Sequence, residues 1–166
     1  MLEKITPWVS SDWQRQTQLI LDSYRHWLGE DLIPPCDHID ERARQLFEAP
    51  IVVVSHGTQA DPVLNYGNRT ALELWEMDLP TLLQTPSRYT AEPVHRDERA
   101  RLLERTTRQG YVDDYSGVRI SRTGRRFQID QAIVWNLIDS QGRPAGQAAT
   151  FSRWVELPLR EAPSAP

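Results

Sequence analysis

Apolar residues recur with a helical period over the first 50 positions of the chain. Steps of three and four residues predict one helix that begins at Ser11 or the serine before it and ends at Gly29. Its apolar face consists of Trp13, Thr17, Ile20, Tyr24 and Trp27. A second helix is predicted between Asp37, a candidate N-cap, and Pro50, which breaks helical hydrogen bonding. Residues 1–49 are therefore expected to form a helical extension.

The pattern changes to that of β-strands after Pro50. Residues 51–56 (IVVVSH) and 63–66 (VLNY) are short apolar runs separated by turn residues, which predicts a β-hairpin. Helices are then predicted from Asn68, near residues 77–86 and, as one long helix, over residues 94–110. The segment SRYTAEP between the last two helices is expected to be a loop.

Three longer strands are predicted in the last third of the chain. Residues 111–121, 126–139 and 144–157 are joined by short turns that contain glycine, which is typical of an antiparallel meander. Together with the first hairpin they predict an α+β fold. It consists of a five-stranded antiparallel sheet with helices inserted between the second and third strands.

Both faces of the middle long strand are apolar, so both are expected to be covered. Strict alternation puts one set of side chains on a single face: Phe127, Ile129, Ile133, Trp135 and Leu137. Which face points toward the inserted helices stays open, because one inserted residue would turn every following side chain around. The other face needs the N-terminal helix or a partner subunit. The candidate cap or dimer surface is Trp13, Ile20, Tyr24 and Trp27.

This order of elements resembles that of PAS sensor domains. More narrowly, VVVSHGTQADPVLNYGNRTALELWEM, QAIVWNLID and the long stretch from PSRYTAEP to GRRF resemble the MEKHLA domain. This PAS-related module occurs in small bacterial proteins and at the C-terminal end of plant class III homeodomain–leucine zipper transcription factors. The resemblance covers about residues 37–155. It implies a PAS-like domain over residues 50–157 that acts as a sensory or regulatory module.

The resemblance also implies where a ligand would bind. In a PAS-like cup, a ligand lies between the inner face of the sheet and the helices that follow the second strand. The candidate ligand-binding residues placed there are Asn65, Tyr66, Asn68, Arg69, Trp75, Tyr89, His95 and Tyr115. Output would pass through a homodimer or a protein partner. The same aromatic residues could instead fill a solid core, which would make the chain a ligand-free interaction scaffold.

The identity of any cofactor stays unknown from the sequence. Light-sensing PAS domains form a flavin–cysteine adduct on the helical segment after the second strand, whereas Cys36 precedes the first strand, so no such adduct is expected. Haem-binding PAS domains use a histidine on the long helix. His95 lies on the predicted long helix, so haem or another small ligand stays among the candidate cofactors. Cys36 and His38 lack further partners at metal-ligand spacing, so zinc is not expected.

No set of residues argues for an enzyme. Ser55 and His56 are adjacent on a strand, so their side chains point to opposite faces and cannot pair as nucleophile and base. Asp113 and Asp114 are separated in the same way. A small-molecule enzyme on a cone-shaped α+β fold remains the alternative, which a histidine or carboxylate pair in a pocket would favour.

The amino-acid composition and the net charge limit the classes of partner that the chain is expected to bind. The chain has 166 residues and a formal net charge of −4, which argues against a nucleic-acid surface as its main function. No apolar run is long enough to span a bilayer or form a signal peptide, and the single cysteine excludes an internal disulfide. A cytoplasmic protein with no membrane partner is expected. The tail, residues 158–166, is expected to be disordered.

Overall fold

The structure, a computed structural model, describes residues 4–158, so most of the expected disordered tail lies outside the described residues. Its helices are α1 (Ser11–Leu28), α2 (Ile39–Glu48), α3 (Arg69–Trp75), α4 (Leu79–Leu82) and α5 (Arg96–Gln109). Three short 3-10 turns are η1 (Pro7–Val9), η2 (Ser87–Thr90) and η3 (Pro93–His95). η2 lies in the segment expected to be a loop, and η3 spans its end and the expected start of the long helix. The strands are β1 (Val52–His56), β2 (Leu64–Gly67), β3 (Tyr111–Ile120), β4 (Arg126–Ile138), β5 (Pro144–Phe151) and β6 (Arg153–Glu156).

The strands form one antiparallel sheet in the order β2-β1-β5-β4-β3, with β6 beside the first half of β4. The α+β architecture predicted from the sequence is therefore confirmed. The predicted last strand is divided into β5 and β6 at Ser152. Both pieces run along the same edge of β4, as the pairs Ile133–Thr150 and Asp130–Arg153 show.

The two faces of β4 exchange their roles at Gln131. This residue has a positive φ of 52°, a conformation that non-glycine residues rarely adopt. Before it, Phe127 contacts the Trp75 ring of α3 at a centroid distance of 5.4 Å. After it, Trp135 contacts the Tyr24 ring of α1 at 5.0 Å. The expectation that Phe127 and Trp135 share a face is wrong, because an irregularity in the strand breaks the alternation between them.

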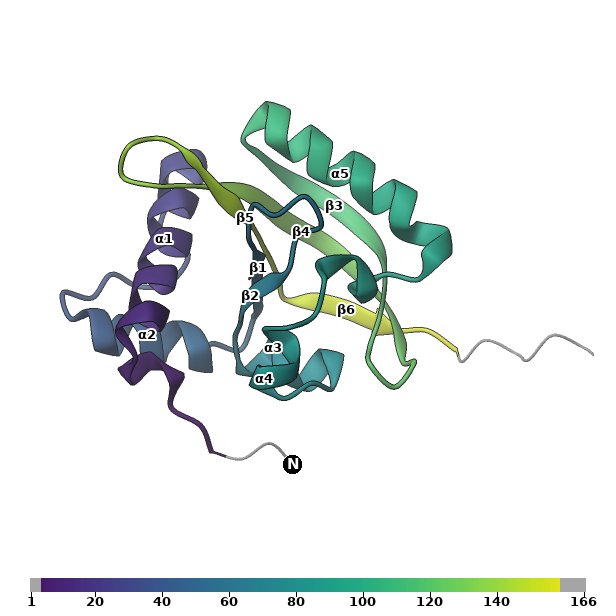
Figure 1. Ribbon diagram of the computed structural model, residues 1–166, viewed down its shortest axis with the longest axis horizontal. Helices are drawn as coiled ribbons and strands as arrows, with labels where there is room; N and C mark the ends of the chain where they lie inside the picture. Colours follow the sequence, from purple (N-terminus) through teal and green to yellow (C-terminus); the bar gives the residue numbers. More distant parts are fainter. Residues whose placement is uncertain (1–3, 159–166) are drawn as a thin grey trace, which may run out of the picture.

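Helices cover both faces of the sheet (Figure 1). The helices α1 and α2 lie against what we call the outer face, and α3, α4 and α5 lie toward the inner face. On the outer face Trp13 stacks on Tyr66 at 4.5 Å, and the indole of Trp135 donates to the Ile20 carbonyl at 3.3 Å. The apolar face of α1 thus packs on the chain's own sheet. Trp13, Ile20 and Tyr24 are buried there, so this face covers the sheet of its own chain.

The Asn68 side chain joins three elements in the core. It is fully buried, and its Oδ1 accepts hydrogen bonds from the Val53 amide at 3.0 Å and, as the N-cap of α3, from the Ala71 amide at 3.1 Å. Its Nδ2 donates to the Ile51 carbonyl at 2.7 Å and to the Leu46 carbonyl at 3.2 Å. One amide therefore holds together the end of α2, the start of β1 and the start of α3.

We predict that Asn68→Ala destabilises the fold by about 3 kcal/mol or more, because it leaves several buried polar groups without partners. The matched control is Asp78→Ala. Asp78 caps α4 at an exposed position, where its Oδ1 accepts from the Thr81 amide at 2.8 Å, and losing such a cap costs about 1 kcal/mol. Urea unfolding of both variants measures the difference. Equal costs for the two substitutions would contradict the role assigned to Asn68.

The Glu76 side chain connects the β3–β4 hairpin to the end of α3 through hydrogen bonds. Its carboxylate accepts hydrogen bonds from Ser121 Oγ at 2.7 Å, from the Thr123 hydroxyl and from Arg125 Nη1 at 3.2 Å. The hydroxyls of Thr123 and Ser121, with a smaller contribution from Arg125, lower the pKa of Glu76 to about 2. The charged form of Glu76 is thus favoured by folding.

We predict that Glu76→Gln removes part of the pH dependence of stability. A carboxyl whose pKa is depressed on folding stabilises the protein above its unfolded pKa of about 4.3, and this contribution disappears as the pH falls toward the folded value. The wild type should therefore lose more stability than Glu76→Gln between about pH 5 and pH 2. Urea midpoints across that range test this, with the exposed Glu73→Gln as control. Parallel pH profiles of wild type and Glu76→Gln would refute it.

Candidate ligand-binding site

A small cavity lies between the inner face of the sheet and the helices that cover it. Its volume is about 70 Å³, enough for about five waters at the usual 10–15 Å³ each. Most of the wall is apolar and includes Val54, Leu64, Leu102, Ile129, Val134 and Phe151. β1, β4 and β5 supply the floor, and η2 and α5 supply much of the cover.

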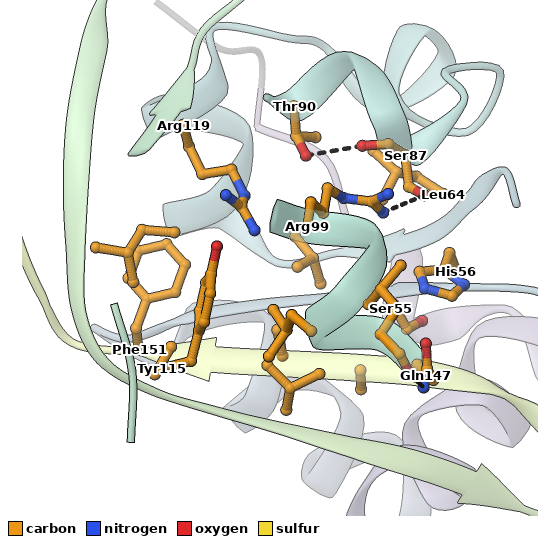
Figure 2. Close-up of a pocket in the computed structure, with 18 of the residues that line it drawn as sticks. Ser55, His56, Leu64, Ser87, Thr90, Arg99, Tyr115, Arg119, Gln147 and Phe151 are labelled. Atoms are coloured by element: carbon orange, nitrogen blue, oxygen red, sulfur yellow. Dashed lines mark hydrogen bonds between the residues drawn. The ribbon is translucent and has the colours of Figure 1, made fainter. Parts of the chain in front are cut away.

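Two arginines from opposite sides line this cavity (Figure 2). Arg99 comes from α5, and its Nη2 donates to Ser87 Oγ on η2 at 2.6 Å. Arg119 comes from β3, is 7% exposed, and donates to the Val118 carbonyl at 2.9 Å. No aspartate or glutamate is among the described lining residues. Both guanidinium groups are therefore satisfied by neutral oxygen atoms only in the described part of the chain.

The two cations affect each other. Burial, followed by the charge of Arg119, lowers the pKa of Arg99 to about 10. Removing a guanidinium from water disfavours its charged form, and a second positive charge nearby acts in the same direction. The cavity therefore carries an excess of positive potential at neutral pH.

Tyr115 lies along the floor beside Arg119. The Arg119 guanidinium is 5.2 Å from the centre of the Tyr115 ring, and Figure 2 shows the Tyr115 hydroxyl pointing toward it. That hydroxyl is buried and has no hydrogen-bond partner. Gly117 makes this orientation possible, because a Cβ at position 117 would overlap the Tyr115 hydroxyl. The arrangement leaves a polar group at the cavity that no part of the described chain satisfies.

We predict that Gly117→Ala destabilises the protein by about 1–3 kcal/mol, the usual cost of overpacking. The cause is specific to Tyr115, so the same substitution should cost less in a Tyr115→Leu background. A double-mutant cycle of unfolding free energies measures the coupling between the two positions. Additive costs would show that Gly117 serves only the backbone of β3.

His56 and Trp75 are two further lining residues that carry a buried polar atom without a hydrogen-bond partner. His56 Nδ1 lies 3.0 Å from the Gly57 carbonyl, which can only accept, so Nδ1 carries the proton and Nε2 is an acceptor. Burial lowers the pKa of His56, and Arg99 adds to this effect, so the ring is neutral. The buried His56 Nε2 and Trp75 Nε1 both lack a hydrogen-bond partner.

The structure places six of the eight expected ligand-binding residues outside the cavity lining. Asn65 and Tyr66 face α1: Gln16 Nε2 donates to Asn65 Oδ1 at 3.4 Å, and Tyr66 stacks on Trp13. The register between β1 and β2 shifts after Ser55, so Asn65 has no backbone pairing partner on β1, and its side chain instead accepts a hydrogen bond from Ser55 Oγ at 2.5 Å. Asn65 and Tyr66 therefore belong to the packing of the outer face.

The other four misplaced residues have structural contacts instead. Asn68 is the core amide described above, and the Arg69 guanidinium lies 5.1 Å from the centre of the Phe47 ring on α2. Tyr89 is 49% exposed, with the Arg88 guanidinium over its ring at 4.5 Å. His95 is the N-cap of α5 and lies 4.0 Å from Glu98. Tyr89 and His95 lie on η2 and η3 outside the cavity lining, although Ser87 and Thr90 of η2 line the cavity.

Trp75 and Tyr115 are the two residues of the expected pocket that do line the cavity, and Arg99, Arg119 and His56, which were not placed in that pocket, line it as well. The sequence position of Arg99 indicates that its side chain faces inward. Arg99 precedes Leu102, Leu103 and Thr106 by three, four and seven residues, so it shares the inward face of the long helix.

A polar network joins the cover of the cavity to the outer layer. Gln147 Nε2 on β5 donates to the Leu103 carbonyl of α5 and to Asn136 Oδ1, each at 3.0 Å. Asn136 Nδ2 on β4 donates to the Thr106 carbonyl of α5 at 3.0 Å. On the other side, the Trp27 indole of α1 donates to the Asn136 carbonyl at 2.9 Å. Through Asn136, α5 and α1 are attached to the same point of the sheet.

Comparison with known proteins decides the family. The sequence profile of the MEKHLA domain matches residues 14–156. The chain belongs to the MEKHLA domain family. Among curated relatives of this MEKHLA chain, the homeobox-leucine zipper protein HOX10 of Oryza sativa subsp. indica is 25% identical over 137 residues, which cover 81% of the chain and 16% of that protein. ATHB-9 of Arabidopsis thaliana is 27% identical over 104 residues, 63% of the chain and 12% of that protein. The MEKHLA chain thus spans less than a fifth of these plant proteins.

Solved structures similar to the MEKHLA chain are PAS and light-oxygen-voltage domains. The PAS domain of a Colwellia psychrerythraea protein matches with a TM-score of 0.58 and 11% identity, over 72% of this chain and 96% of that one. The light-state dimer of the fungal blue-light photoreceptor Vivid matches with a TM-score of 0.55 and 13% identity, over 80% and 88%. These likenesses show a PAS-like fold.

Within residues 4–158, no group of three or more histidine, cysteine, aspartate or glutamate side chains could hold a metal ion. None of the helices in that range is long and apolar enough to cross a membrane.

Proposed function

We propose that this MEKHLA chain is a sensory or regulatory module that binds a small organic ligand in the cavity under α5. The observation that carries the proposal is the set of buried polar atoms without hydrogen-bond partners on residues that line this cavity: the Tyr115 hydroxyl, His56 Nε2 and Trp75 Nε1. Buried polar groups are nearly always hydrogen-bonded in native proteins. A ligand with an apolar body and a few polar atoms would satisfy them, as ligands do in pockets of this kind.

Binding without turnover agrees best with the chemistry of the wall. His56 is the one acid–base side chain in the described lining apart from Tyr115 and the arginines, and no carboxylate accompanies it. Ser55, its neighbour in sequence, points to the outer face, where Gln16 Nε2 donates to its Oγ at 3.1 Å. General acid–base or nucleophilic catalysis needs two such groups in contact. The sensory roles of PAS and light-oxygen-voltage neighbours support the same proposal.

Signal transfer would follow the network between α5 and α1. A ligand that contacts Arg99 on α5 changes the position of the helix that Asn136 and Gln147 hold to the sheet. Asn136 also receives the Trp27 hydrogen bond from α1, so a shift of α5 alters the support of the outer layer. Ligand occupancy and the stability of α1 are then coupled through a continuous set of contacts.

Output from the module would pass to a second copy of the chain or to another protein. Vivid, a structural neighbour, is described as forming a light-state dimer, and this supports association as a form of output. A cytoplasmic location is part of the proposal, in keeping with a single free cysteine, Cys36. The proposal does not extend to the activity of the plant relatives, because the chain spans less than a fifth of their length.

Native mass spectrometry of the protein purified from cells tests ligand binding. We expect an additional bound mass on the wild type and its loss in Ala149→Leu. Ala149 lines the cavity and pairs with Val54 and Val134, so a larger side chain there fills the space a ligand needs. The matched control is Ala100→Leu, the same change at an exposed position of α5, which should retain the bound mass.

The opposite result would be a wild type without bound mass that also gains no thermal stability from any compound in a small-molecule collection. That outcome would indicate a ligand-free scaffold. Retention of the mass in Ala149→Leu would place the ligand elsewhere on the protein.

A further inference from the structure

Resting on the proposed function, we infer that the ligand of this cavity is a small carboxylate with an apolar body, whose charged group is held between Arg99 and Arg119. The inference concerns the class of ligand, and it follows from the distribution of charge and hydrogen-bond donors over the cavity wall.

The charge on the wall is uncompensated. Ser87 Oγ and the Val118 carbonyl, both neutral, are the oxygen atoms bonded by Arg99 and Arg119 in the described residues. Elsewhere in the chain, arginines near the same elements have carboxylate partners: Arg126 pairs with Glu92 at 2.6 Å, and Arg125 pairs with Glu76 at 3.2 Å. A buried charge without a partner is costly, and removing one member of a buried pair leaves this cost in full. A bound anion would supply the missing partner.

The geometry suits a planar, two-oxygen group. A guanidinium presents parallel N–H donors that match a carboxylate, and such charge-assisted bonds are among the strongest in proteins. Arg99 and Arg119 approach the cavity from α5 and β3, and the Tyr115 hydroxyl points toward the Arg119 side of the same space (Figure 2). A carboxylate there would accept from both arginines and from the unpartnered Tyr115 hydroxyl.

The apolar remainder of the cavity wall favours a ligand whose uncharged part is apolar. Leu64, Leu102, Ile129, Val134 and Phe151 offer apolar contact and few further donors. Inorganic phosphate carries more charge and needs more donors than two arginines and a hydroxyl supply, so a monocarboxylate is the better match. The cavity volume of about 70 Å³ favours a short chain over a multi-ring cofactor. His56 Nε2 remains as an acceptor for a hydroxyl on the ligand.

Titration calorimetry and thermal unfolding of the full chain test the inference with defined probes. The probes are butanoate and hexanoate, their primary amides butanamide and hexanamide, hexylamine and inorganic phosphate. We expect the carboxylates to bind and to raise the unfolding temperature. The amides, which have nearly the same shape without the charge, should bind about tenfold more weakly or worse, as the loss of charge-assisted hydrogen bonds implies.

Variants of the arginines separate binding from folding. Arg119→Met should weaken hexanoate binding about tenfold or more, with Arg119→Lys between it and the wild type. Arg101→Met, at an exposed position of α5, should bind as the wild type does. Without ligand, Arg119→Met should be at least as stable as the wild type, because it removes an uncompensated charge. A loss of stability without any change in hexanoate affinity would show that Arg119 is structural and would overturn the inference.

The remaining outcomes distinguish this inference from the proposed function. Amides that bind as tightly as the carboxylates would overturn the inference that the ligand is an anion. The chain would still be a ligand-binding module. Tighter binding of phosphate or of hexylamine than of the carboxylates would likewise overturn the inference that the ligand is a carboxylate. Failure of every probe, together with a wild type that carries no bound mass from cells, would remove the proposed function itself.

Discussion

The hydrogen bonds of the Asn68 side chain are the constraint on which the other layers of this fold depend. Its amide is shared among the carbonyls that end α2 and precede β1 and the amides of β1 and α3. Because both its donor and its acceptor sides are used in a fully buried position, no other side chain of similar size can replace it. Asn68 sets where the outer layer meets the sheet and where α3 begins, and α3 carries Trp75 to the cavity.

A second constraint lies in the middle of β4. The irregular residue Gln131 allows one strand to send Phe127 and Ile129 inward and, a few residues later, Trp135 outward. The inner face then has small residues, Ala132 and Ala149, where larger ones would have filled the space. The cavity thus results from two features together: a reversal of the strand and short side chains directly after it.

These features explain which parts of the molecule could be predicted. The helices and turns were predictable because their signals are local, such as the glycine with φ of 75° that ends α1 and the Asn68 cap. The orientation of β4 was not, because Gln131 is neither glycine nor proline and nothing nearby in the sequence indicates a positive φ. In the site, Trp75 and Tyr115 were placed by their position in the order of elements. Asn65 and Tyr66 were misplaced because the irregular pairing of β2 depends on contacts with α1 that are distant in sequence.

The packing of α1 on the outer face has a consequence for any protein that associates with this one. That face is occupied by α1, which is joined to the sheet through α2 in the same chain, so α1 competes with an external partner as an intramolecular ligand. A partner that binds elsewhere pays no such penalty, and one that binds the outer face must first release Trp13, Tyr24 and Trp27 from their contacts. The free energy needed to release α1 would therefore be subtracted from the affinity of any partner that binds this face.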